Sequence, residues 1–150
     1  RLKGMLYLEK EQLHLSCSDF GEAYSGGWNW KDYFVQATIT PVTGKMHLLQ
    51  ARVQGAIRSY AVALLPDDTI GILKNDNGYR TLCRAEFEWK MGETYQLFIQ
   101  VQGNLITAGI NKEQILVFQD KDHPYFYGSF GLGVQNGSHM CCREIQVKSI

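Results

Sequence analysis

The sequence predicts an all-β domain that folds as a two-sheet antiparallel β-sandwich of the jelly-roll type. Apolar and polar residues alternate along several segments, turn residues separate these segments at short intervals, and almost no segment carries the apolar period of a helix. Alternation with a period of two is typical of half-buried strands, and many short strands between tight turns are typical of sandwiches and barrels. The 150 residues suit one domain, residues 1–150, because a chain of this length buries a core without disulfide staples.

Two segments show the alternation most clearly. In residues 33–40 the apolar side chains at positions 35, 37 and 39 share one face, and glutamine and threonine share the other. In residues 95–101 the side chains at positions 97, 99 and 101 are apolar, whereas Gln96 and Gln100 point the other way. Each segment therefore predicts a strand with one face on the core.

Turn sequences delimit the other strands. Asn77-Gly78, the strongest short hairpin signal, separates residues 70–75 from residues 79–84. The remaining turns are Pro66-Asp67-Asp68, Gln102-Gly103-Asn104, Asn111-Lys112-Glu113 and Asn136-Gly137-Ser138. They bound strands at 58–65, 105–110, 115–119, 128–135 and 140–149, and the whole chain is expected to hold about eleven or twelve strands.

The charge balance argues against a nucleic-acid partner. Lys plus Arg and Asp plus Glu are equal at 15 each, so the formal net charge is zero, whereas nucleic-acid binders usually carry a basic excess. No apolar run reaches the roughly 18 residues that a membrane-spanning helix needs, so no membrane partner is expected. The chain begins at Arg1 rather than Met, which favours a fragment of a larger protein.

The four cysteines, Cys17, Cys83, Cys141 and Cys142, do not have the spacing of a zinc site. Cys141 and Cys142 are neighbours on an expected strand, so their side chains point to opposite faces and are poor disulfide partners. Free, mostly buried thiols are the simplest interpretation. They favour a reducing compartment such as the cytoplasm.

The C-terminal strands carry a recognisable succession of motifs, at residues 92–97, 101–106, 118–120, 127–133 and 145–147. In this order the chain resembles the concanavalin A-like lectin/glucanase superfamily, in particular its laminin-G-like and fructan-type carbohydrate-binding members. Trp30–Tyr33, Arg52–Tyr60 and Lys74–Arg80 further resemble the C-terminal β-sandwich of some bacterial ADP-ribosylglycohydrolase-family proteins. In those proteins a separate helical domain is the hydrolase, so the resemblance implies a hydrolase parent and a non-catalytic chain here.

A polar strand face is the leading candidate for ligand binding. Gln50, Arg52 and Gln54 lie at alternate positions and are expected on one sheet face. Neighbouring strands add further polar and aromatic side chains: Arg58, Tyr60, Lys74, Tyr79 and Arg80. Sugars need donors and acceptors for hydroxyls and an aromatic plane for their C–H faces, and these residue types supply both. An ordinary solvated face and a domain–domain interface are the alternatives.

Two loops are secondary candidates. Trp28 and Trp30 alternate, and we expect Trp30 in the core and Trp28 at the rim as a stacking platform, unless both pack over a sheet edge. Asn136 and His139 flank a turn that could approach the same polar face, or form a plain turn.

Catalytic and metal-binding patterns are weak. Glycosidases of the resembling superfamily carry two glutamates in an E-x-D-x-E pattern, which is missing here; Glu86 and Glu88 flank core-like aromatics and read as a surface pair. The histidines lack metal or triad spacing. The resemblance implies a structural calcium for which Asp120 is the candidate, with Asp19 and Glu22 also available; the alternative is that Asp120 bonds turn backbone groups as an Asx motif.

The sequence therefore predicts a non-catalytic carbohydrate- or glycoconjugate-binding module, whose ligand is a sugar or the ribose part of an ADP-ribosyl group. The first alternative is a structural accessory domain that docks onto a catalytic, ADP-ribosylglycohydrolase-like domain of the same protein. A laminin-G-like adhesion module is the third hypothesis, disfavoured because the cysteines do not suggest a secreted disulfide framework.

Overall fold

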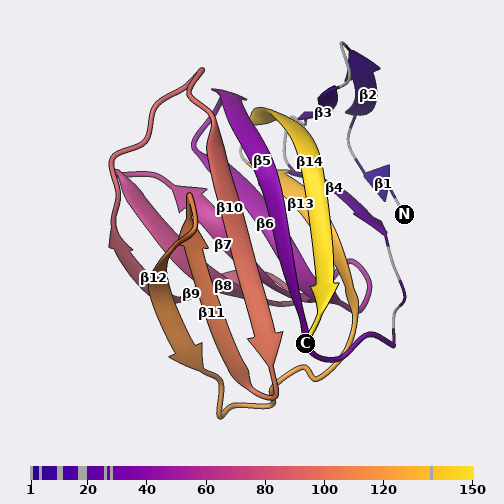
Figure 1. Ribbon diagram of the computed structural model, residues 1–150. Helices are drawn as coiled ribbons and strands as arrows, with labels where there is room; N and C mark the ends of the chain where they lie inside the picture. Colours follow the sequence, from indigo (N-terminus) through magenta and orange to yellow (C-terminus); the bar gives the residue numbers. More distant parts are fainter. Residues whose placement is uncertain are drawn as a thin grey trace.

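The structure, a computed structural model, is an antiparallel β-sandwich of two seven-stranded sheets (Figure 1). It describes the strands within residues 2–25 and residues 27, 29–135 and 137–150, with side chains described from Gly27 onward. Fourteen strands lie in this described part. The count exceeds the eleven or twelve expected, and four of the fourteen are short strands that precede residue 26.

Sheet A contains, in spatial order, β1 (Leu2–Lys3), β4 (Phe20–Ser25), β13 (Ser129–Gln135), β6 (Met46–Val53), β7 (Arg58–Leu65), β8 (Thr69–Asp76) and β9 (Tyr79–Glu86). Sheet B contains β12 (Glu113–Gln119), β11 (Leu105–Ile110), β10 (Tyr95–Gln102), β5 (Tyr33–Thr43), β14 (His139–Ser149), β3 (Gln12–Ser16) and β2 (Met5–Glu9). The chain crosses between the sheets several times, so strands distant in sequence become neighbours, as β6 and β13 do (Figure 1). The all-β sandwich expected from the sequence is confirmed.

The core lies between the sheets and follows the predicted alternation. Val35, Ala37 and Ile39 of β5 are fully buried, and they face the equally buried apolar residues of β10 across an antiparallel register. The predicted hairpin at Asn77 joins β8 to β9, and Asn77 has the left-handed backbone that such turns require. No helix in the described part of the chain is long and apolar enough to cross a membrane.

Strand β6 departs from the regular pattern at its end. The pairing of β6 with β13 shifts register between Ser129 and Gly131, so two β6 residues oppose one β13 residue. Arg52 sits in this β-bulge with a φ of 50°, a conformation that rotates a side chain away from the face its position predicts. The expectation that Gln50, Arg52 and Gln54 share one polar face is therefore wrong, because it assumed an unbroken strand.

The bulge lies at the end of the sandwich where several loops meet. The backbone of Gly128 donates to the Trp30 carbonyl oxygen at 2.9 Å, and that of Asn77 donates to the Ile57 carbonyl at 2.9 Å. Residues 29–32, 54–57, 77–78, 103–104 and 120–128 form this end, together with the last residue of the chain. We call it the loop end.

Candidate ligand-binding site

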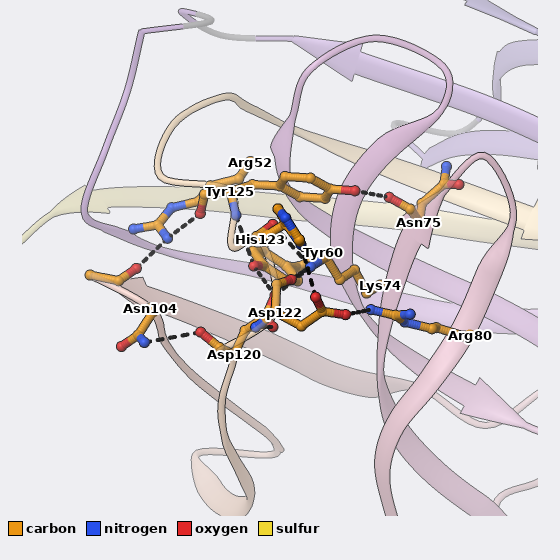
Figure 2. A network of polar contacts seen from close by, with 11 residues as sticks. Arg52, Tyr60, Lys74, Asn75, Arg80, Asn104, Asp120, Asp122, His123 and Tyr125 are labelled. Atoms are coloured by element: carbon orange, nitrogen blue, oxygen red, sulfur yellow. Dashed lines mark hydrogen bonds and ion pairs between the residues drawn. The ribbon is translucent and has the colours of Figure 1, made fainter.

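A buried arginine holds the loop end together. The guanidinium of Arg52 donates from Nε to the Lys31 carbonyl at 3.1 Å and from Nη1 to the Gly103 carbonyl. The Nη1 atom also donates to the Tyr125 carbonyl at 2.7 Å (Figure 2). Its Nη2 lies 3.1 Å from Oδ1 of Asp32. Burial lowers the pKa of Arg52, and the nearby Asp32 carboxylate opposes that shift. The side chain is fully buried, so it fixes loops rather than facing solvent.

A lysine and an aspartate form the second buried support. Nζ of Lys74, on β8, lies 2.7 Å from Oδ2 of Asp120, and the two side chains are only 2% and 3% exposed. The same Nζ donates to the carbonyl oxygens of Asp122 and His123, at 2.5 and 3.1 Å (Figure 2). Burial would raise the pKa of the Asp120 carboxyl, but hydrogen bonds from Lys74 and Tyr60 outweigh it and hold this pKa below its usual value.

Two tyrosines complete the support. The Tyr60 hydroxyl donates to Asp120 at 2.6 Å and accepts the backbone N–H of Tyr125 at 3.0 Å. Burial, together with the hydrogen bond to Asp120, raises the pKa of Tyr60. The Tyr125 hydroxyl donates to the Asn75 carbonyl at 2.7 Å, and its ring centroid lies 4.9 Å from the Lys74 ammonium. Hydrogen bonds with Lys74 and Tyr60 thus hold the backbone of residues 120–125 at several positions (Figure 2).

The loop that these groups pin presents aromatic side chains outward. Phe126 is 52% exposed and Tyr127 is 41% exposed. They border a hollow of about 410 Å³, whose polar walls are Gln54, Arg58, Asp76 and His123. Pro124 and the edge of Tyr125 complete the lining. We call this the aromatic hollow.

The polar groups of the aromatic hollow are fixed by the strands beneath. Arg58 and Asp76 are register partners on β7 and β8, so a cation and a carboxylate stand side by side at the rim. The Gln54 amide donates to the Tyr127 carbonyl at 2.8 Å and ties the β6–β7 turn to the aromatic segment. Beside the hollow, Arg80 pairs with Asp122 at 3.2 Å on the surface. Hydrogen bonding from His123 and Arg80 lowers the pKa of Asp122.

The structure distributes the sequence-predicted residues over several places. Gln54 and Arg58 line the aromatic hollow and Arg80 lies beside it, whereas Arg52, Tyr60 and Lys74 are buried beneath it. Gln50 is buried and donates to the Tyr79 hydroxyl. Tyr79 packs on a small apolar cluster on the outer face of sheet A, formed by Leu48, Ala61, Ala63, Leu65 and Leu73.

The loop before β14 does not reach the aromatic hollow. His139 pairs with Thr43 at one end of β5, whereas Ser149 pairs with Tyr33 at the other end, beside the loop end. The expected approach of His139 to the polar residues is therefore wrong, because the eleven-residue β14 separates the two. Asn136 and Trp28 lie outside the described residues.

Trp30 also differs from the expectation. The prediction that it lies in the core is wrong: the side chain is 37% exposed and stacks on Phe130 with a centroid distance of 6.2 Å. Residues 29–32 are not a strand, so alternation does not apply to them. Trp30 borders a second hollow of about 370 Å³, whose other lining residues are Lys31, Asp32, Tyr33, Val147 and Ser149.

A structural calcium does not fit at Asp120. The Oδ2 atom already accepts hydrogen bonds from Lys74 and Tyr60, and the Oδ1 atom accepts the backbone N–H of Asp122 at 3.0 Å. This last contact is the Asx turn that was the alternative interpretation. The described side chains form no group of three or more His, Cys, Asp or Glu that could hold a metal. Asp19 and Glu22 lie outside the described side chains.

The sequence reasoning missed the aromatic segment of the site. His123-Pro124-Tyr125-Phe126-Tyr127 lies between two strands and alternates neither with period two nor with a helical period. A proline and three aromatics in a connection are unusual, because loops are mostly polar and small. That composition is the sequence feature that could have indicated a functional role for this connection.

Neither known protein-family models nor curated proteins match this chain. Solved structures match its fold. The carbohydrate-binding module CBM66 from Bacillus subtilis has a TM-score of 0.88 and 16% identity, over 98% of this chain and 92% of that one. The exoplasmic/lumenal domain of VIP36, in a Ca²⁺- and Man3GlcNAc-bound form, has a TM-score of 0.71 and 13% identity, over 100% of this chain and 84% of that one. Galectin LEC-6 of Caenorhabditis elegans has a TM-score of 0.61 and 12% identity, over 85% and 89%.

At these identities the matches show the fold. The chain shares the lectin-like β-sandwich fold of these domains, so the fold that the resemblance implied is confirmed. The resemblance to ADP-ribosylglycohydrolase-family proteins stays a prediction.

Proposed function

We propose that this β-sandwich is a non-catalytic carbohydrate- or glycoconjugate-binding module that holds its ligand in the aromatic hollow. The observation that carries the proposal is the exposure of Phe126 and Tyr127 beside Arg58 and Asp76. Exposed aromatic rings offer apolar planes to the C–H faces of a sugar. Arg58 offers donors and Asp76 offers acceptors, which is the pair of functions that vicinal hydroxyls require.

The rigidity of the hollow supports the same proposal. Affinity is lost when a loop has to be ordered on binding, and a loop held in advance avoids that cost. Here Arg52 and Lys74 hold the carbonyls of residues 122, 123 and 125 before any ligand arrives. The similarity in fold to a carbohydrate-binding module and to lectins also supports a sugar as the ligand class.

The experiment is a glycan-array screen of the 150-residue chain followed by calorimetry on the sugars that bind. We expect Phe126→Ala and Arg58→Ala each to weaken binding by about tenfold or more, because each removes a contact of about 1.4 kcal/mol or greater. Val117→Ala and Arg143→Ala are the matched controls, since both residues are exposed on sheet B and line neither hollow. Unchanged affinity in both test variants would move the site elsewhere.

Docking onto a catalytic domain is the second candidate function. Ile57, 49% exposed, lies in the β6–β7 turn at the loop end that also carries Phe126. Exposed apolar side chains in one region also suit a protein partner. An ADP-ribosylglycohydrolase-like domain of the same protein is the partner that the sequence resemblance favours, and an ADP-ribosyl ribose is then a candidate ligand. The array should therefore include ADP-ribose; no binding to any sugar or to ADP-ribose would favour docking.

The proposed module carries no chemistry of its own. Glu86 and Glu88, the closest approach to a glycosidase pair in the sequence, are both exposed, while Phe87 and Trp89 pack into the core.

A reducing compartment is part of the same proposal. Cys83 and Cys142 are free thiols, and burial raises the pKa of Cys142 to about 12.

A further inference from the structure

The Lys74 ammonium occupies a complete cage of oxygen acceptors. An ammonium has three N–H donors, and the three oxygens around this one are Oδ2 of Asp120 and the carbonyl oxygens of Asp122 and His123. A carboxylate with two backbone carbonyls from one short loop is also the kind of donor set that calcium prefers. The cage therefore has the chemistry of a divalent-cation site, with a side-chain cation inside it (Figure 2).

We infer that Lys74 serves as the resident cation of this loop, so that residues 120–127 keep their shape without metal, and that removing the ammonium creates a divalent-cation site. The stem of Lys74 is buried and its head lies beside the Tyr125 ring, so the charge is delivered from β8 at a fixed position. A tethered cation does not dissociate, whereas a bound ion depends on its free concentration. The inference concerns the loop itself and holds or fails whether or not the ligand is a sugar.

The test compares wild type, Lys74→Ala and the double variant Lys74→Ala/Asp120→Asn, with Ca²⁺, with a chelator and with Tb³⁺ as a luminescent calcium substitute. Wild type should have the same melting temperature in Ca²⁺ and in chelator. Lys74→Ala should melt at lower temperature in chelator, and its melting temperature should rise with the logarithm of free Ca²⁺. Tb³⁺ luminescence excited through Tyr60 and Tyr125 should appear in Lys74→Ala and be lost in the double variant.

Lys121→Ala is the matched control, because it removes a neighbouring exposed lysine outside the cage. It should behave as wild type in every arm. Two results would overturn the inference: a wild-type melting temperature that falls in chelator, or a Lys74→Ala variant that neither melts higher in Ca²⁺ nor sensitises Tb³⁺. If Lys74→Ala stays unfolded even in saturating Ca²⁺, the inference is also overturned. The comparison of wild type in Ca²⁺ and in chelator can be made whether or not this variant folds.

The second hollow carries an independent inference, which rests on the proposed function. It adjoins the aromatic segment, because the Gly128 backbone beside Tyr127 donates to the Trp30 carbonyl. One face of Trp30 is covered by Phe130, and the exposed remainder stands beside Lys31 and the half-exposed Asp32. An exposed indole with an ammonium and a carboxylate repeats the aromatic-plus-polar chemistry of the first hollow.

We propose that the second hollow is a further sugar subsite, and that the natural ligand is an oligosaccharide that passes over Tyr127 and Gly128 from one hollow to the other. The test is calorimetry with mono- to hexasaccharides of the sugar found on the array. Trp30→Ala should weaken binding of the longer chains about tenfold and leave the monosaccharide unchanged, and Trp30→Phe should restore part of the loss. Phe126→Ala should weaken all lengths.

The outcomes separate the two proposals. If no sugar binds, the proposed function fails. If sugars bind but Trp30→Ala, folded by its melting curve, matches wild type at every length, only the subsite fails.

Discussion

Arg52→Met tests whether the buried guanidinium organises the loop end. Methionine keeps the apolar stem of the side chain and removes the guanidinium, with its charge and its donors. In wild type those donors serve the carbonyls of Lys31, Gly103 and Tyr125 and the carboxylate of Asp32. The left-handed backbone at position 52 strains methionine as much as arginine, so a difference in backbone strain does not enter the comparison.

The magnitude follows from the burial of each acceptor. The Tyr125 carbonyl belongs to a buried residue, and a buried acceptor without a partner costs about 1–3 kcal/mol. The carbonyls of Lys31 and Gly103 belong to exposed residues, where water replaces part of the loss. Asp32 is 43% exposed, and a pair of that exposure is worth no more than about 1 kcal/mol. The buried carbonyl and the ion pair together give about 1–4 kcal/mol, and the two exposed carbonyls add little because water can replace the guanidinium.

The assay is urea denaturation of wild type, Arg52→Met and Arg143→Met, the last being an exposed arginine on β14. A loss of about 1–4 kcal/mol corresponds to roughly 2–16 °C in the melting temperature of a 150-residue domain. Arg143→Met should change the free energy of unfolding by less than about 0.5 kcal/mol. If Arg52→Met loses less than about 1 kcal/mol, water or a rearranged loop satisfies the carbonyls and the proposed role of Arg52 is refuted.

Three further predictions follow from other parts of the fold. Gly128→Ala should cost about 1–3 kcal/mol more than Gly55→Ala in urea denaturation. A Cβ at Gly128 would lie 2.4 Å from the Arg52 backbone, whereas Gly55 also has a positive φ but has open space around it. Equal losses would contradict the clash. Burial lowers the pKa of His47 below 6.5, so the free energy of unfolding should have its full value above pH 6.5. It should fall as the pH drops below 6.5, because the unfolded chain binds the proton first. His47→Gln should remove this pH dependence and exposed His123→Gln should keep it, whereas an unchanged pH dependence in His47→Gln would refute the assignment. Cys142, with its pKa raised to about 12 by burial, should resist alkylation at pH 8 until the chain unfolds; rapid labelling of the native protein at that position would show an open site.

The strands could be predicted because their signals are local. Positions 35, 37 and 39 alternate in sequence and are all fully buried on one face of β5, and Asn77-Gly78 turns the chain where expected. The bulge at Arg52 could not be predicted in the same way. Left-handed backbone occurs mostly at glycine or asparagine, so an arginine in the sequence does not predict it. One unrecognised bulge moved the side chain from the expected outer face to the interior.

The sequence indicated several residues that the structure gathers at the loop end, but not their roles there. Long polar side chains on strands suggested a ligand surface, yet Tyr60 and Lys74 point between the sheets and meet Asp120 from a distant loop. That encounter depends on long-range topology, which single-strand alternation does not contain. The aromatic segment was missed for the opposite reason: its residues follow no strand or helix period, so pattern analysis assigned it to a connection.

The buried polar network is better explained by loop shape than by stability. Burying an ion pair such as Lys74–Asp120 removes two charges from water, and apolar residues of equal volume are often as stabilising or more so. Apolar side chains, however, cannot bond the carbonyls of residues 122, 123 and 125, which lie in a connection with no strand partner of its own. Only donors can hold that backbone in one conformation once water is excluded. The network therefore fixes the segment that carries Phe126 and Tyr127, and the two exposed rings owe their position to the polar residues that the sequence first suggested as ligand contacts.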